Sequence, residues 1–287
     1  MNTILSMKNI TKSYKKFTLD NITAEIPTGL STALIGTNGA GKTTLLDIIA
    51  GISMNFKGEM NYFGKYSDVN EPYVRNAIGY VSANNYFGID WKLKNIKSVL
   101  SAAFDNFSSE RFDELLKKFN IDMDGKKVMQ LSDGNIMRLM LASVLARDTR
   151  LLVLDEPASP LDPVMRDRLC DMFREYTSDG ERSVLFSTHN IADMENVTDY
   201  AIIMANGTII EQGYVDDLKE KYILVHGDGE NYDRFKPYMV DSSGGKSGFE
   251  GIALDSERHR FETGDIIIEA PRLQQICVGL LKNAENN

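Results

Sequence analysis

The sequence predicts an α/β protein of the P-loop class, on three observations. Residues 36–44 spell Gly-Thr-Asn-Gly-Ala-Gly-Lys-Thr-Thr, which fills every fixed position of the P-loop pattern. An apolar stretch suited to a buried strand, residues 30–35, precedes the loop, and residues 44–50, which have helical periodicity, follow it. Two more apolar runs, residues 151–154 and 184–187, have the composition of buried strands in a parallel sheet.

The predicted phosphate loop consists of Gly36, Thr37, Asn38, Gly39, Ala40, Gly41, Lys42, Thr43 and Thr44. Glycines let backbone N–H groups approach phosphate oxygens closely, and the helix that follows adds the positive end of its dipole. In this pattern Lys42 reaches the β- and γ-phosphates, and the Thr43 hydroxyl completes a Mg²⁺ shell. A chance glycine-rich turn would not carry the flanking strand and helix, so the loop predicts nucleotide binding.

Composition limits the classes of function. At 287 residues the chain can form one large domain and one small one. Its net charge of −9 argues against a protein held to nucleic acid mainly through phosphate contacts, so no nucleic-acid partner is expected. Residues 1–8 lack the pattern of a secretory signal, and no stretch has the ~20 apolar residues of a transmembrane helix. We therefore expect any membrane connection to come through a partner.

Periodicity and turn residues predict the remaining elements. Strands are expected at residues 4–11, 17–26, 58–64, 77–81, 201–205 and 208–210, the last two joined by a hairpin turn at Asn206-Gly207. Helices are expected at 96–104, 112–119 and from Asp162-Pro163 to about Tyr176. Trp91 and the two cysteines, Cys170 and Cys277, are expected to be buried, the cysteines as thiols in a reducing compartment. Residues 223–287, which are polar with several glycines, predict a small α+β region that ends in a helix after Pro271.

Two apolar strands end in groups that carry chemistry. Residues 151–154 are followed by Asp155 and Glu156, and burying such charges is costly unless they have a partner. In a P-loop protein the first acid can hold the Mg²⁺ shell and the second can polarise water, whereas two solvated acids at a strand end are the alternative. His189 follows the strand at 184–187. Because ligands gather at the carboxyl ends of parallel strands, His189 is a candidate contact for the γ-phosphate.

The order of these motifs resembles the ATP-binding subunit of ABC transporters over residues 4–222. The phosphate loop precedes a helical insert, Leu-Ser-Asp-Gly-Asn at 131–135, Leu-Asp-Glu-Pro at 154–157, Ser-Pro-Leu-Asp at 159–162, and then His189. The resemblance implies a RecA-like core, an antiparallel β subdomain and an α-helical subdomain at about residues 84–148. It places a small C-terminal accessory domain at 223–287, outside the ATP-binding domain at 1–222.

The resemblance also implies roles for single residues. Tyr14, otherwise a plain surface aromatic in a turn, matches the side chain that stacks on adenine. Asp155 matches the acid that supports Mg²⁺, Glu156 the general base and His189 the switch histidine, with ATP and Mg²⁺ as cofactors. Further matches are Asp162, for the acid of the loop that faces the dimer partner, and Ser132 and Gly134, for the signature motif that contacts the γ-phosphate bound to the opposite subunit. Taken without the resemblance, Ser132 and the residue after it suit a helix N-cap.

Partners and location follow from the same resemblance. It implies a second ATP-binding subunit, identical or different, and a separate transmembrane permease that holds the chain at the inner, cytoplasmic face of the membrane. Four departures from the family pattern indicate a branch. Asp133 replaces the first of two signature glycines, Asn135 replaces a Gln, Ala83 occupies the position of a loop Gln, and Pro160 replaces a small residue. These variants, and the tail at 270–276, resemble ATPases of bacterial ABC-2-type exporters of the antimicrobial-peptide and peptide-toxin type.

Three functions stay open at this point, and the first is favoured. The chain hydrolyses ATP to power an exporter; or it is a weakly hydrolysing, regulatory subunit of a heterodimer; or it is an ABC ATPase that acts on ribosomes or DNA. Glu156 and His189 argue against the second, although Asp133 and Ala83 favour it. The third fits poorly because ribosome-acting members usually carry two such domains and DNA-repair members carry a long coiled-coil insertion, for which residues 44–131 are too short.

Overall fold

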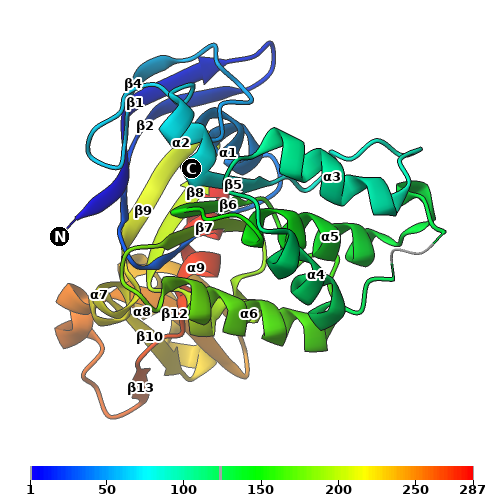
Figure 1. Cartoon of the computed structure of the whole chain (residues 1–287). Coiled ribbons are helices and arrows are strands. Elements are labelled where there is room, and N and C mark those ends of the chain that lie inside the picture. Colours follow the sequence, from blue (N-terminus) through cyan, green and yellow to red (C-terminus); the bar gives the residue numbers. More distant parts are fainter. Residues whose placement is uncertain (1, 123–124, 287) are drawn as a thin grey trace.

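The computed structural model describes residues 2–122 and 125–286; residues 1, 123, 124 and 287, which fall within the expected domains, lie outside this description. The described chain forms three sheets, with helices packed around and between them (Figure 1). A six-stranded sheet lies at the centre, a three-stranded sheet covers part of it, and a four-stranded sheet is formed by the C-terminal region.

The central sheet positions the phosphate loop. Its strand order is β5-β6-β7-β3-β8-β9, and all neighbours are parallel except β8 and β9. The strands are β3 (Ser31–Gly36), β5 (Ile78–Val81), β6 (Leu151–Leu154), β7 (Ser183–Thr188), β8 (Tyr200–Ala205) and β9 (Thr208–Tyr214). The predicted hairpin at Asn206-Gly207 is confirmed: both residues have positive φ, 49° and 80°, as a two-residue turn of this kind needs. Because β3, β6 and β7 are parallel, the loops that follow them leave the sheet at the same edge.

One face of the central sheet is covered by α1 (Lys42–Ile49) and by the antiparallel sheet β2-β1-β4. The strands of that sheet are β1 (Thr3–Ser13), β2 (Thr18–Pro27) and β4 (Lys57–Tyr62). Inward side chains alternate with exposed ones along β2, as a sheet with one solvated face requires. Apolar side chains such as Ile22, Leu46 and Ile202 form one buried cluster between the two sheets.

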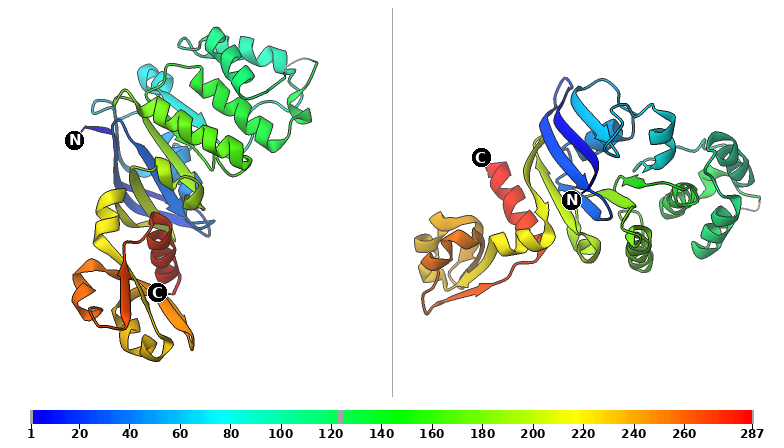
Figure 2. Two further views of the ribbon diagram at one scale, coloured as in Figure 1. Left: turned by 90° about the horizontal axis from the view of Figure 1, so that it is seen from below. Right: turned by 60° about the vertical axis from the view of Figure 1, so that its left-hand side comes forward.

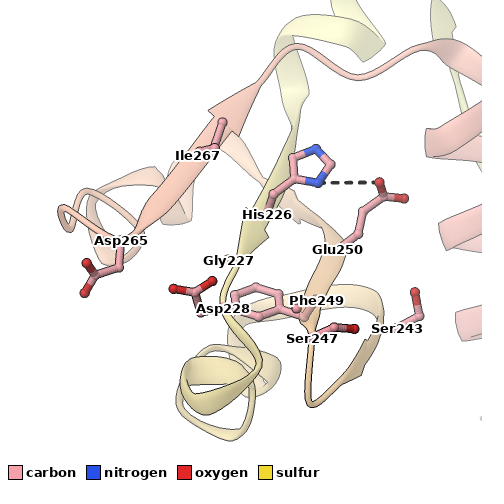
Figure 3. Close-up of a pocket in the computed structure, with 10 residues that line it drawn as sticks. His226, Gly227, Asp228, Ser243, Ser247, Phe249, Glu250, Asp265 and Ile267 are labelled. Carbon is pink, nitrogen blue, oxygen red and sulfur yellow. Dashed lines mark ion pairs between the residues drawn. The ribbon is translucent and has the colours of Figure 1, made fainter.

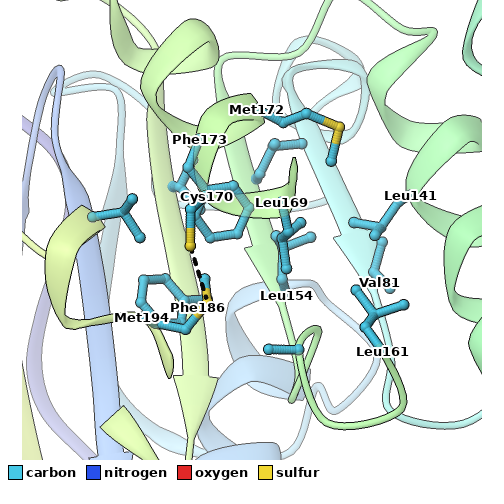
Figure 4. Close-up of a cluster of buried hydrophobic side chains, with 14 of the residues drawn as sticks. Val81, Leu141, Leu154, Leu161, Leu169, Cys170, Met172, Phe173, Phe186 and Met194 are labelled. Atoms are coloured by element: carbon cyan, nitrogen blue, oxygen red, sulfur yellow. Dashed lines mark hydrogen bonds between the residues drawn. The ribbon is translucent and has the colours of Figure 1, made fainter. Parts of the chain in front are cut away.

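The other face of the central sheet is covered by helices. They are α3 (Leu93–Ala103), α4 (Ser109–Lys118), α5 (Asp133–Leu145) and α6 (Pro163–Thr177), whereas Val74 of α2 (Pro72–Ala77) packs in the cluster of the first face. Two predicted caps are confirmed, because Ser132 accepts from Asn135 N and Asp162 from Met165 N. Ser108 caps α4 in the same way, accepting from Arg111 N. Phe173, Phe186 and Leu154 are part of the buried cluster between α6 and the sheet (Figure 4).

The expectation that Trp91 packs in the core is wrong, because its side chain is 41% exposed. Residues 89–92 run beside 127–129, and the Trp91 carbonyl accepts a hydrogen bond from Val128 N at 3.0 Å. This pairing fixes the backbone so that the indole lies over Gly88 instead of under the helices. Phe87, four residues earlier, takes the core position and is 6% exposed.

The C-terminal region forms an antiparallel sheet with strand order β11-β12-β10-β13. Its elements are α7 (Val215–Lys221), β10 (Tyr222–Gly227), α8 (Tyr232–Phe235), β11 (Met239–Gly245), β12 (Gly248–Leu254), β13 (Ile266–Glu269) and α9 (Leu273–Asn286). A 3₁₀ segment, Asp255–Arg260, stands between β12 and β13, so the order of elements is that of the ferredoxin-like split β-α-β motif. Phe235, Phe249 and Phe261 cover one face of this sheet.

Helix α9 is shared between the C-terminal sheet and the central sheet. It packs against β11 and β12 on one side and against β8 and β3 on the other, and Figure 2 shows it (red) between the two layers. Leu273, Ile276 and Cys277 of α9 belong to the same buried cluster as Ile203 of β8 and Ile252 of β12. The predicted terminal helix is therefore confirmed, and the apolar core runs through it from one sheet to the other.

Both cysteines are buried free thiols, as predicted. Burial raises the pKa of the Cys277 thiol to about 12, and burial also raises the pKa of Cys170. Among the described residues, no helix is long and apolar enough to cross a membrane.

Candidate nucleotide site

The loop between β3 and α1 has the shape that the P-loop pattern predicts. Gly39 and Gly41 have φ values of 85° and 105°, a conformation that side chains with a Cβ rarely adopt. A Cβ at Gly41 would also lie 2.7 Å from the ring of Phe17, which packs against the loop. On its other side the loop is held by the β8–β9 turn, because Gly207 N donates to the Ala40 carbonyl at 3.1 Å. The loop is thus fixed from two directions.

Lys42 lies folded over this loop. The residue is 6% exposed, and its ammonium donates to the carbonyls of Gly36 at 2.8 Å and Thr37 at 3.3 Å. The same nitrogen lies 3.4 Å from Oε1 of Glu156. The cation is therefore placed at the mouth of the backbone N–H cradle, where phosphate oxygens bind in this pattern.

Asp155 is a fully buried carboxylate at the end of β6. Oδ2 accepts from the Thr43 hydroxyl at 2.8 Å, and Oδ1 accepts from the Ser187 hydroxyl at 2.6 Å. Among the described residues no Lys, Arg or His forms an ion pair with it. A buried carboxylate with neutral donors alone is costly, and a divalent cation would offset its charge. One carboxylate and one hydroxyl also match the sparse protein ligand set that Mg²⁺ takes when phosphates and waters complete its shell.

Glu156 occupies a strained backbone position directly after Asp155. Its φ is 49°, a left-handed value that is uncommon for a residue with a side chain and that recurs at functional sites. Its N–H donates to the Ser187 hydroxyl at 2.9 Å, and its Oε2 lies 2.8 Å from Nδ1 of His189. Lys42, Glu156 and His189 therefore form one continuous chain of polar contacts, and the structure brings the three predicted catalytic side chains together.

Ser187 was not predicted as a site residue, although it holds both acids. It is fully buried at the end of β7, and its hydroxyl bonds to Asp155 and to the backbone of Glu156. The signal in the sequence is a polar residue at the end of an apolar strand, two positions before His189. That signal gains meaning only when β7 is known to lie beside β6.

Tyr14 stands in the turn between β1 and β2 with its side chain 50% exposed. Its N–H donates to the Phe17 carbonyl at 2.7 Å, and Phe17 in turn contacts the phosphate loop. Lys12 Nζ lies 5.5 Å from the centre of its ring. The Tyr14 ring is therefore exposed, and the turn that carries it reaches the loop through Phe17.

The signature residues lie apart from this cluster. Ser132 caps α5, accepting from Asn135 N at 3.4 Å, and Asp133 is exposed in the first turn of that helix. A Cβ on Gly134 would lie 2.9 Å from the carbonyl oxygen of Pro160, so the glycine allows two loops to approach closely. Of the hydrogen bonds and ion pairs among the described residues, none joins Ser132 or Gly134 to the phosphate loop of the same chain.

The loop that contains Pro160 is fixed to the signature helix. Asp162, besides capping α6, pairs with Arg138 of α5 at 3.0 Å.

The loop after β5 carries the position at which the family pattern has a Gln. Ala83 offers no polar side chain, and Asn84 is exposed, with its N–H bonded to the Ser82 hydroxyl at 3.2 Å. Position 83 therefore lacks the side-chain amide that the family pattern has there.

A second hollow, of about 490 Å³, lies at the edge of the C-terminal sheet (Figure 3). His226 and Glu250 line it and lie 3.5 Å apart, and the other ring nitrogen of His226 lies 3.5 Å from Glu269 of β13. Asp228 and Asp265 add two more acids to its lining. Such an acidic surface repels a triphosphate, in contrast to the loop at 36–44 with its buried Lys42.

Comparison with known proteins identifies the family. Residues 19–159 match the family described as ABC transporter. YxlF of Bacillus subtilis, an uncharacterised ABC transporter ATP-binding protein, is 32% identical over 224 residues, which cover 76% of this chain and 73% of YxlF. The tungstate uptake ATP-binding protein TupC of Peptoclostridium acidaminophilum is 32% identical over 212 residues, 72% of this chain and 97% of TupC. The chain belongs to the ABC transporter ATP-binding proteins. It is accordingly an ATP hydrolase of the ABC type.

Solved structures agree with this assignment. The ATP-binding subunit of an ABC transporter superposes with a TM-score of 0.68 at 25% identity, covering 76% of this chain and 92% of that one. The predicted P-loop fold with a RecA-like core is therefore confirmed. In this chain the phosphate loop, Asp155 and Glu156 fall within the segment that matches the family, whereas His189 and the C-terminal sheet follow it.

Proposed function

We propose that this chain binds ATP with Mg²⁺ and hydrolyses it as one half of a head-to-tail pair of ATP-binding subunits, and so drives a separate transmembrane permease. One observation carries the proposal. The Lys42–Glu156–His189 chain of contacts and the buried Asp155–Thr43 pair converge on the same phosphate loop. Phosphoryl transfer to water needs a cation, a base, a group that orients the base, and ligands for the metal. The residues around this loop supply all four.

The residues divide the work as follows. Thr43 and Asp155 would hold Mg²⁺, which when bound neutralises charge on the β- and γ-phosphate oxygens. Lys42 binds the same phosphates, and Tyr14 stacks on the adenine. Glu156 orients water and accepts its proton, while His189, bonded to the Glu156 carboxylate at 2.8 Å, holds that carboxylate in place.

The second half of the site comes from another subunit. Ser132 and Gly134 are solvent-accessible and, within the described chain, form no hydrogen bond with the phosphate loop, so a partner's signature helix can close over the nucleotide. A solved structure with the same fold, the bacterial ABC transporter cassette MJ0796, is dimeric; it has a TM-score of 0.64 and 22% identity to this chain. The partner is a second copy of this chain or a different subunit. The exposed carboxylate of Asp133 would weaken a pair of identical chains by repelling the triphosphate.

The permease docks in a groove between the central sheet and the helices. This groove, of about 510 Å³, lies beside the loop after β5 and has an apolar lining that includes Ile52, Leu100 and Phe104. Arg147 lies in it, 5% exposed, and its hydrogen bonds among the described residues go to neutral carbonyl oxygens; desolvation lowers its pKa to about 10. A permease segment with an apolar face and one carboxylate would satisfy this cation. Docking there would keep the chain at the cytoplasmic face of the membrane.

The direction we propose is export, with residues 223–287 as an accessory region. It rests on the variant positions Asp133, Asn135 and Ala83, which resemble ABC-2-type exporters. The relatives include importers, namely TupC and the sulfate/thiosulfate import protein CysA of Bacillus cereus, which is 28% identical over 287 residues. Reconstitution of the co-purified permease in vesicles decides the direction: ATP supplied on the side of this chain should expel substrate from that side.

Hydrolysis by the purified chain tests the proposal. Glu156→Gln keeps the shape of the side chain but removes the base, so ATP turnover should fall by at least about 100-fold while ATP remains bound. ATP should then hold the variant as a dimer, visible as a doubled mass. Glu175→Gln, which changes a 78% exposed acid on α6, is the matched control and should keep full turnover. Wild-type turnover no faster than that of Glu156→Gln would overturn the proposal and favour the regulatory subunit.

A further inference from the structure

The segment that follows His189 lies between the nucleotide site and the C-terminal region. It consists of two 3₁₀ turns, Ile191–Asp193 and Glu195–Val197, between β7 and β8. Ile191 and Met194 are at most 3% exposed and pack in the same buried cluster as the apolar face of α9. This segment therefore connects the end of β7, which is followed by His189, to the C-terminal helix.

Glu195 binds the start of α9. Its Oε1 accepts from Leu273 N at 2.9 Å and its Oε2 from Gln274 N at 3.5 Å, and Lys219 of α7 lies 3.4 Å from Oε1. The first N–H groups of a helix have no partner inside the helix, and a carboxylate there also meets the positive end of the dipole. Glu195 is 16% exposed, so water competes little for these bonds. A side chain far earlier in the sequence thus caps the terminal helix.

The segment is held equally firmly on the side of α6. Asp193 pairs with Arg166 at 2.8 Å and accepts from Asn190 Nδ2 at 3.1 Å. Met194 Sδ lies 3.8 Å from Cys170 Sγ, as the dashed line in Figure 4 shows. Residues 190–195 are therefore held by contacts to both α6 and α9. A displacement of α9 would move this segment and, through it, the adjacent His189.

We propose that Glu195 is a positioning residue, through which α9 and the C-terminal sheet set the orientation of His189 against Glu156. The inference rests on the proposed hydrolysis, since it concerns how that site is held. The His189–Glu156 contact is a hydrogen bond of 2.8 Å, and such bonds weaken steeply with misalignment. A partner that moves the C-terminal sheet would then change turnover without touching the nucleotide pocket.

The test compares Glu195→Gln and Glu195→Ala in the full chain. Gln keeps an acceptor but loses the charge, and Ala loses both, so kcat should fall in the order wild type, Gln, Ala, by about two- to tenfold in all. The KM for ATP should not change, because Tyr14 and the phosphate loop do not contact Glu195. In a His189→Ala background, Glu195→Ala should have no additional effect, because the residue acts through His189.

Cys277 reports independently on the docking of α9. It is 2% exposed on that helix, one turn after Leu273, and its raised pKa keeps the thiol protonated, so native protein should resist alkylation. Peptide mapping of the alkylated protein, which distinguishes Cys277 from Cys170, should show faster modification of Cys277 in the Glu195 variants. Lys282→Gln is the matched control at the other end of α9: it removes a 4.0 Å pair with Asp241 of β11 but leaves the Glu195 bonds, so kcat should be unchanged.

The outcomes separate this inference from the proposed function. Faster alkylation of Cys277 in Glu195→Ala with unchanged kcat would mean that α9 does not act on His189, and would overturn the inference alone. An additive loss in the His189→Ala background would also overturn it. A wild-type chain without ATP turnover would refute the proposed function, and this inference with it. A melting curve for each variant shows whether it is folded, and Glu195→Gln is the milder variant if Glu195→Ala is not.

Discussion

The phosphate half and the signature half of the site differ in how they are held. In the phosphate half, Asp155, Ser187 and Lys42 are buried and each makes two or more polar contacts within the chain. In the signature half, Ser132 and Asp133 are exposed, and the Ser132 hydroxyl caps its own helix. The first half is thus preorganised by its own fold, whereas the second is a surface that acquires a role when another chain meets it. Substitutions in the phosphate half should therefore have larger effects on ATP binding, stability and turnover than substitutions of exposed signature residues.

The largest effect should come from Lys42→Ala in the phosphate half. This change removes the ammonium folded over the loop, and it also leaves Glu156 with His189 as its remaining ionisable partner among the described residues. ATP affinity should fall by about 100-fold, the usual result of truncating one member of a buried charge pair. Titration calorimetry with ATP and Mg²⁺ measures it. Lys57→Ala, at an exposed position of β4, should bind like wild type, and an unchanged Kd for Lys42→Ala would mean that ATP binds elsewhere.

Ser187→Ala should have an intermediate effect on both stability and turnover. It leaves Asp155 Oδ1 and the Glu156 N–H without their shared partner, and an unsatisfied buried group costs about 1–3 kcal/mol. Urea unfolding measures the loss, and turnover should fall because the strained Glu156 backbone loses its anchor. Ser178→Ala, at an exposed site after α6, should change the free energy of unfolding by less than about 0.5 kcal/mol. Equal losses of unfolding free energy in the two variants would mean that the Ser187 hydrogen bonds do not stabilise the fold.

Asp133→Gly should have the smallest effect. It tests whether the charge in the signature half opposes dimerisation. An exposed carboxylate close to a triphosphate repels it, so removing the charge should tighten ATP-driven dimerisation by up to about fivefold. Asp133→Asn separates charge from backbone freedom and should act like glycine if charge is the cause. Analytical ultracentrifugation with Glu156→Gln and ATP measures the association. Weaker association in both variants would show that the acid instead binds a cation or a group of the partner.

The two halves also differ in how far sequence predicted them. The phosphate loop, Asp155 and Glu156 were predictable because a glycine pattern, a strand and a helix lie within a short stretch, and local geometry follows from local sequence. The caps at Ser132 and Asp162 were predictable for the same reason. Ser187, Glu195 and the docking of α9 were not, because each depends on which distant elements become neighbours. Trp91 was misassigned since its position is set by pairing with residues 127–129, and composition does not encode that pairing.

The central claim is that one nucleotide site is built from two chains, and mixing two inactive variants tests it most directly. Lys42→Ala breaks the phosphate half. Ser132→Asp breaks the signature half by placing a negative charge there, yet it preserves the fold because Asp is also a good N-cap. Each variant alone should lack turnover. In an equal mixture, mixed dimers contain one intact site, so about a quarter of wild-type turnover should return if pairing is random and symmetric. A mixture as inactive as its components, while wild-type chain is active, would contradict the two-chain site.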